Sequence, residues 1–370
     1  MSRKQLSLRQ VAILSLALAT FLGFSEIGVQ AQSATANFVY VMTNKSPDNS
    51  VIQYLRNADG SLTWLREVQT GGNGTGATGV DPLGSQDSLV LSGDGHLLLA
   101  ANAGSNDVTV FQIQNNTLTW WNKIPSGGSF PNSLALYGDL VYVLNAKGAT
   151  PNITGFRLGP DGFLHMIPGA QVNLPSGAAG PNDIRFAEDG EKLLVTLSAS
   201  NQILVFEVGN IGVANPPSVQ SSAGASPFGI RSGRNGVTVV SEAAGSVSTY
   251  SFSPADMLDV ISRAVSDTQS ASCWLSLNRL ATYAYISNTG SGTISSYQID
   301  SSGHLTLLNA VAANTGGAPI DSALSRDSRF MYVLDSAMGR VIIFKVNGGN
   351  LSQTGMISSL PTSIQGIAAQ

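Results

Sequence analysis

The sequence predicts an all-β protein built from seven copies of one unit, and three observations carry this prediction. The first is a phrase of strand, polar glycine-rich turn and strand, which is clearest between Tyr283 and Ile299. The second is composition, because 40 glycines among 370 residues indicate many tight turns. The third is spacing. An aromatic residue of the second strand recurs every 44 to 57 residues, at Tyr54, Phe111, Phe156, Phe206, Tyr250, Tyr297 and Phe344. This period is typical of the blades of a seven-bladed β-propeller.

Each copy predicts a blade of four strands. After the aromatic strand, several copies show a polar turn and a Gly-x-Leu start to a further strand, as at residues 60–62 and 303–305. A short strand follows a proline in other places, as at Pro181 and Pro227. The run 97–101 is continuously apolar, which is expected for a central strand buried on both faces between neighbouring blades.

The two ends of the repeat complement one another. The first copy begins directly with the second strand of a blade, at Val39 to Met42, and residues 364–368 supply the short innermost strand that this blade lacks. We expect these segments to pair and close the ring, because an open array would leave unpaired strand edges. The sequence favours one helical turn, which follows residues 253–256 and runs from Met257 to Ile261.

The N-terminal residues 1–31 have the pattern of a signal peptide. Three basic residues precede an apolar run that ends near Phe24, and small residues follow. Cleavage is expected after residue 31 or residue 36, which leaves a propeller over 37–370. An uncleaved membrane anchor is the alternative, but the run is shorter than the roughly 20 residues a span needs. The sequence therefore predicts export, to the periplasm or the extracellular space, without a membrane span in the mature chain.

Composition and motifs argue against several classes of function. Charged residues make up 11% of the chain and the net charge is -4, so no basic surface for nucleic acid is expected. The single cysteine, Cys273, excludes an internal disulfide and a cysteine metal cluster. The glycine pattern at 74–79 matches a dinucleotide fingerprint but is followed by Asp81-Pro82, where that motif requires a helix. We therefore expect no cofactor and no metal.

Polar residues at positions predicted to face the central channel are the candidate ligand-binding residues. They are Gln86, Asp87, Asn132, Asn182 and Asp321. Water in the channel is the alternative explanation for them.

Three further residues are candidates for catalysis, namely Glu242, Asp183 and Arg185. Glu242 ends a strand where the other copies mostly carry asparagine, and a carboxylate there could act as a general base or bind a polyol.

Several phrases of the sequence resemble the β-propeller lactonase family, which includes 6-phosphogluconolactonases and carboxymuconate-lactonising enzymes. The resemblance extends from about residue 37 to residue 370. It is carried by phrases such as Gly84-Ser-Gln86, Gly180-Pro-Asn-Asp183, Val240-Ser-Glu-Ala243 and Ser287-Asn-Thr-Gly290. In the family, a histidine and an arginine from a Pro-Arg-His phrase and a glutamate handle the lactone. Here the phrase reads Pro181-Asn182-Asp183, and the usual place of the glutamate reads Leu197.

The resemblance implies a small polar or sugar-like ligand at the channel mouth and possible hydrolysis of a lactone. Glu242 or Asp183 would activate water, and Arg185 with backbone N–H groups would stabilise the oxyanion. The departures from Pro-Arg-His argue against phosphogluconolactone, since that cytosolic substrate calls for a basic pocket. The alternative is a non-catalytic envelope scaffold with a protein partner. A catalytic channel would pair its acids with cations, whereas a scaffold would present a dry apolar rim.

Overall fold

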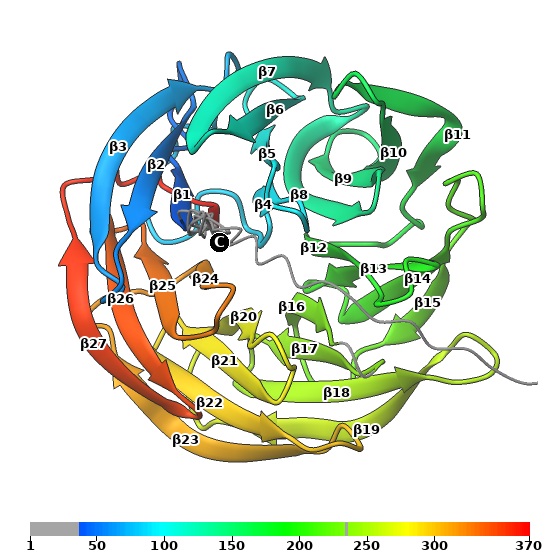
Figure 1. Ribbon diagram of the computed structural model, residues 1–370. Helices are drawn as coiled ribbons and strands as arrows, with labels where there is room; N and C mark the ends of the chain where they lie inside the picture. Colours follow the sequence, from blue (N-terminus) through cyan, green and yellow to red (C-terminus); the bar gives the residue numbers. More distant parts are fainter. Residues whose placement is uncertain (1–36, 234–235) are drawn as a thin grey trace, which may run out of the picture. The chain divides into compact units, whose positions relative to one another are not determined.

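The structure is a computed structural model that describes residues 37–233 and 236–370. These residues form seven four-stranded antiparallel sheets that stand as blades around a ring (Figure 1). The predicted seven-bladed β-propeller is therefore confirmed. The predicted signal peptide, residues 1–31, lies outside the described residues. Within the described ranges, no helix is long and apolar enough to cross a bilayer.

The innermost strand of each blade lines the central channel (Figure 1). These strands are β4 (Leu89–Leu91), β8 (Ser129–Tyr137), β12 (Pro181–Phe186), β16 (Pro227–Ser232), β20 (Ser272–Leu277), β24 (Ser322–Leu324) and β28 (Ile367–Ala369). The second strands are β1 (Phe38–Met42), β5 (Leu97–Asn102), β9 (Leu140–Lys147), β13 (Lys192–Leu197), β17 (Thr238–Glu242), β21 (Tyr283–Asn288) and β25 (Phe330–Asp335).

Two further strands complete each blade towards the outside. The third strands are β2 (Ser50–Arg56), β6 (Asp107–Gln114), β10 (Asn152–Leu158), β14 (Gln202–Glu207), β18 (Ser246–Phe252), β22 (Thr293–Ile299) and β26 (Arg340–Asn347). The outer strands are β3 (Leu62–Gln69), β7 (Thr117–Pro125), β11 (Leu164–Asn173), β15 (Ser218–Ser221), β19 (Leu258–Ser266), β23 (Leu305–Asn314) and β27 (Asn350–Ile357).

The hydrophobic core lies between blades rather than within one of them. The central strands are buried on both faces, and all six residues of β13 are buried. Val39 of the first blade, for example, belongs to the same apolar cluster as Tyr332 and Ile343 of the last blade. Burial on both faces explains why the central strands read as continuous apolar runs, since each face must pack against a neighbouring blade. Outer strands are partly exposed, as in β3 and β27.

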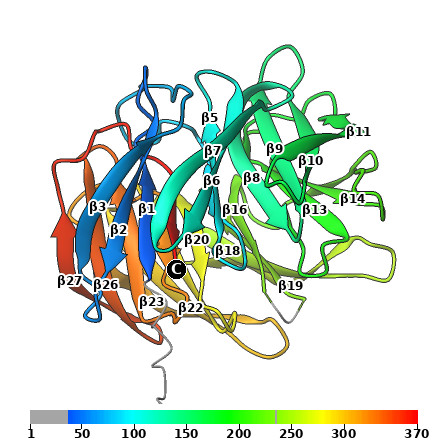
Figure 2. The same cartoon turned by 45° about the horizontal axis from the view of Figure 1, so that its top comes forward.

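Pairing of the C-terminal strand with the N-terminal blade closes the ring. β28 lies antiparallel to β1, with Val39 opposite Ala369 and Val41 opposite Ile367. The first and last blades stand side by side in both views (Figure 2). The Tyr332 hydroxyl of the last blade donates to the Gly60 carbonyl of the first at 3.0 Å. The closure predicted from the two chain ends is thus confirmed.

Candidate functional site: an arginine pocket at one channel mouth

A cavity of about 380 Å³ opens at the mouth where the innermost strands end. Six of the seven innermost strands line it, namely β4, β12, β16, β20, β24 and β28, so it lies on the axis of the ring. Arg185, Arg231 and Arg279 contribute three guanidinium groups to its lining. Among the described lining residues, Asp87 is the only carboxylate. We call this cavity the arginine pocket.

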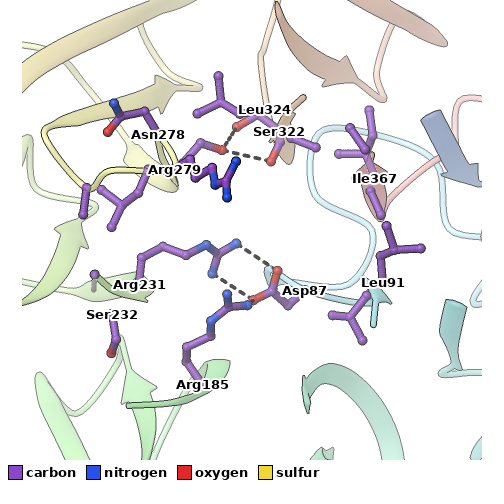
Figure 3. A pocket seen from close by; sticks show the side chains of 18 of the residues that line it. Asp87, Leu91, Arg185, Arg231, Ser232, Asn278, Arg279, Ser322, Leu324 and Ile367 are labelled. Carbon is purple, nitrogen blue, oxygen red and sulfur yellow. Dashed lines mark hydrogen bonds and ion pairs between the residues drawn. The ribbon is translucent and has the colours of Figure 1, made fainter. Parts of the chain in front are cut away.

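The floor of the arginine pocket is a network of charges in which Arg231 is central (Figure 3). Its two terminal nitrogens bind both Asp87 carboxylate oxygens at 2.8 Å, a bidentate pair. The same Arg231 side chain lies 3.3 Å from Asp183, and Arg185 reaches Asp87 at 3.2 Å. The Arg231 side chain is 12% exposed, whereas that of Arg185 is 38% exposed. Arg231 therefore holds the network together, and Arg185 has surface left for a ligand.

Burial shifts the pKa values of the acids beneath the floor. Burial, followed by the charge of Asp87, raises the pKa of Asp183 to about 7, although Arg231 acts in the opposite direction. The same two causes raise the pKa of Asp321 well above its ordinary value. Both shifts favour the neutral form of these acids. With three arginines and one carboxylate in its described lining, the arginine pocket is net positive and suits an anionic group.

The opposite half of the channel is filled by the chain itself, through residues 79–87, which we call the plug segment. The Ser85 hydroxyl donates to the Asn132 carbonyl on β8 at 2.7 Å. The Trp274 indole on β20 donates to the Ser85 carbonyl at 3.0 Å. Gln365, just before β28, accepts from the Leu83 N–H and donates to the Ser85 carbonyl. The plug segment is thus bonded to strands on several sides of the ring.

Gln86 places Asp87 at the floor of the arginine pocket. Its buried amide donates to the Leu275 carbonyl at 2.7 Å and accepts from the Leu275 N–H at 3.1 Å, across the channel on β20. A Cβ on Gly229 would lie 2.3 Å from the Gln86 amide oxygen and would displace this amide from its present position. The next residue, Asp87, has a left-handed φ of 62°, which turns its side chain towards the arginines.

The other predicted ligand-binding residues lie below the arginine pocket. Asn132 is buried and donates to the Pro181 carbonyl at 3.0 Å. Asn182 donates to the Gly84 carbonyl of the plug segment at 2.7 Å. Asp321 is 3% exposed and accepts from the Ser322 N–H. The structure therefore brings three of the predicted site residues together, namely Asp87, Asp183 and Arg185. The charge of Asp87 also acts on Asp321. The two asparagines contact the plug segment instead.

Glu242 lies apart from the arginine pocket, at the other end of its blade. It pairs with Pro227 at the start of β16, whereas Arg231 near the end of that strand pairs with Val239. Its carboxylate is fully buried and accepts from Ser246, Ser248 and the Gly224 N–H. Equivalent positions carry Asn102 and Asn145, whose amides donate to side chains of the hairpin that follows, whereas Glu242 accepts from its hairpin.

The positions given by the family resemblance run from the plug segment to the floor of the arginine pocket. Pro181 and Asn182 begin β12, and Leu197 ends the neighbouring β13 opposite Pro181. Asp183, the third residue of the phrase, lies 3.3 Å from Arg231, and Arg185 follows two residues later at the arginine pocket. The position that corresponds to the histidine of Pro-Arg-His is therefore part of the charge network beneath the pocket.

Sequence reasoning did not identify Arg231 or Arg279. The signal for Arg231 was present: Pro181-Asn-Asp-Ile-Arg185 and Pro227-Phe-Gly-Ile-Arg231 have the same spacing on two neighbouring innermost strands. Arg279 follows β20 in a loop, and no repeat marks its position. Cys273 is buried, and burial raises the pKa of its thiol to about 12, as expected for a small apolar residue rather than a nucleophile.

Comparison with solved structures shows the same fold at low sequence identity. The periplasmic gluconolactonase PpgL of Pseudomonas aeruginosa matches with a TM-score of 0.72 and 14% identity, over 90% of this chain and 99% of that one. A protein of Bacteroides fragilis provisionally named 6-phosphogluconolactonase matches with a TM-score of 0.71 and 18% identity, over 91% and 98% of the two chains.

Comparison with protein families identifies the family directly. No curated protein matches the sequence. The family model described as lactonase, 7-bladed beta-propeller, matches residues 30–166 and 213–363, which is well over half of the chain. The chain therefore belongs to the lactonase family of seven-bladed β-propellers.

Proposed function

We propose that this protein binds a small, polar, negatively charged ligand in the arginine pocket and hydrolyses a lactone there. The observation that carries the proposal is the composition of the pocket: three arginines surround one carboxylate in a cavity on the channel axis. Acids paired with cations, such as Asp87 with Arg231 at 2.8 Å, are what a catalytic channel requires and a dry scaffold rim does not. The lactone comes from the family.

In the proposed reaction, Asp87 accepts a proton from a water molecule. The water oxygen attacks the carbonyl carbon of the lactone and forms a tetrahedral oxyanion. Arg185, whose side chain is 38% exposed, stabilises the negative charge on this oxygen, and Arg231 holds Asp87 in place. The ring C–O bond then breaks, the leaving oxygen takes the proton from Asp87, and a hydroxy acid is released. Asp183 acts indirectly, by holding Arg231 in place.

The experiment is a pH-stat assay of sugar and aliphatic lactones with the wild type and Asp87→Asn. We expect turnover above the buffer rate in the wild type and a loss of roughly 100-fold or more in the variant, as removal of a general base gives. Asp259→Asn is the matched control, because Asp259 is exposed on outer strand β19. No turnover in the folded wild type would overturn hydrolysis and favour the alternative, a non-catalytic scaffold.

The same assay with Glu242→Gln and Asp183→Asn distinguishes the two ends of the channel. Loss of turnover in Glu242→Gln but not in Asp87→Asn would move the reaction to the plugged mouth. If Asp183→Asn loses turnover and also binds the ligand more weakly, the result would agree with the proposal that Asp183 positions Arg231.

We also propose that the protein is exported and that the signal peptide is removed after residue 31 or residue 36. The N-terminal pattern supports this, and one structural relative is a periplasmic enzyme. Intact mass spectrometry of the protein from a secretion-competent host should give a chain that starts at Gln32 or Asn37. A mass that includes residues 1–31 would contradict cleavage.

A further inference from the structure

A second cavity adjoins the arginine pocket. This cavity, which we call the rim cavity, has a volume of about 270 Å³ and is lined by Arg326, Ser325 and Ser328, among others. The two cavities share Leu277, Arg279 and Leu324 as lining residues, so they meet at Arg279. A ligand longer than one sugar could therefore extend from the first cavity into the second.

Arg279 and Arg326 are cations without an acidic partner. Across residues 37–233 and 236–370, neither side chain forms an ion pair, and both residues are exposed. Asp327, next in sequence to Arg326, pairs instead with Arg56 at 3.3 Å. The two guanidinium groups are thus free to bind an anion at no cost of breaking an existing pair.

The loops that carry these arginines are held in place by hydrogen bonds. The Arg279 N–H donates to the Ser328 hydroxyl at 3.0 Å and joins the two loops. Asn278 accepts from the Thr282 N–H at 2.8 Å within its own loop. A preorganised loop loses little conformational entropy when a ligand binds. The spacing of the cations is therefore set before the ligand arrives.

The lining of both cavities narrows the class of ligand. None of the described residues that line the two cavities is aromatic, so these residues offer no stacking surface of the kind on which single-stranded nucleic acids depend. Serine hydroxyls line the walls instead, and these suit the hydroxyl groups of sugars.

We infer that the ligand is an acidic oligosaccharide. One carboxylate binds among Arg185, Arg231 and Arg279, and the next binds between Arg279 and Arg326. The inference rests on the arginine pocket being the binding site of the proposed function, but it does not require hydrolysis.

The test is isothermal titration with three probes: galacturonate, trigalacturonate and neutral maltotriose. We expect trigalacturonate to bind at least about tenfold more tightly than galacturonate, because its second carboxylate gains charge-assisted hydrogen bonds that the monomer cannot make. Maltotriose should not bind measurably. Arg326→Gln should remove the gain of the trimer over the monomer, and Arg279→Gln should weaken both.

Arg329→Gln is the matched control. Arg329 is an exposed arginine in the same loop, lies over the Phe330 ring at 5.6 Å and lines neither cavity. Equal binding of monomer and trimer, or equal effects of Arg326→Gln and Arg329→Gln, would overturn the inference. Trimer binding without turnover of any lactone would refute the proposed hydrolysis and leave this inference standing.

Discussion

Removal of residues 363–370 should lower the Tm of the whole protein by at least about 10 °C, as seen by circular dichroism. The segment contains β28 and buries Ile364 and Ile367, which contribute about 1.5–3 kcal/mol each. Its loss also exposes the edge of β1 and removes Gln365, which holds the plug segment. Because the core lies between blades, an opened ring weakens the interfaces on both sides of the gap.

A chain that lacks only Gln370 is the control for this truncation. That residue lies beyond β28, although its N–H donates to the Phe38 carbonyl. Its removal should change the Tm by no more than a few degrees. A truncated chain without residues 363–370 that melts at the wild-type temperature would show that β28 does not hold the ring closed.

The blades could be predicted from the sequence because each one repeats the same physical requirement. A central strand packed on both faces needs a continuous apolar run, and a hairpin needs a polar turn, so the pattern recurs seven times. The same repeat predicted the innermost strands. It also showed that the first blade lacks its innermost strand, which residues 364–368 supply.

The predicted helical turn from Met257 to Ile261 was wrong, because outer strand β19 (Leu258–Ser266) occupies that stretch. Two irregularities in the pairing of β18 with β19 interrupt the alternation of inward and outward side chains. The resulting spacing of partly buried residues resembles that of a helix turn. A bulged strand of this kind cannot be told from a helix by its periodicity alone.

The pocket was only partly predictable, because its floor comes from a segment without periodicity. The plug segment has no periodic sequence pattern, so its path through the channel, and the position of Asp87 next to Arg231, depend on tertiary contacts such as those of Gln86. The polar character of Gln86 and Asp87 was visible in the sequence, but the partners 98 and 144 residues away were not.

Arg231→Met should destabilise the protein by about 3–5 kcal/mol, the usual cost of removing one partner of a buried ion pair. Methionine keeps the apolar stem but leaves Asp87 and Asp183 without their shared cation. The measurement is urea unfolding of the wild type and the variant at about pH 5 and about pH 9.

The pH dependence of this loss has a definite sign. The pKa of Asp183 in the folded wild type is raised to about 7 by burial and by Asp87, above its unfolded value of 3.8. Its contribution to stability therefore falls as the pH rises from about 4 to about 7. Arg231 lowers this pKa, so its removal raises the pKa further and extends the decline above pH 7. The gap between variant and wild type should thus be larger at pH 9 than at pH 5.

Arg340→Met is the control variant for Arg231→Met. It shows how much stability is lost when a buried, paired arginine is removed outside the arginine pocket. Arg340 is 13% exposed and binds the fully buried Asp335 at 2.8 Å, but neither residue lines the arginine pocket. Both variants should lose stability. Galacturonate should raise the Tm of the wild type and of Arg340→Met, because a ligand that binds only the folded state stabilises it. It should leave the Tm of Arg231→Met unchanged. An equal rise in the Tm of the wild type and both variants would show that galacturonate binds without the Arg231 guanidinium group. The anion site would then lie outside the arginine pocket.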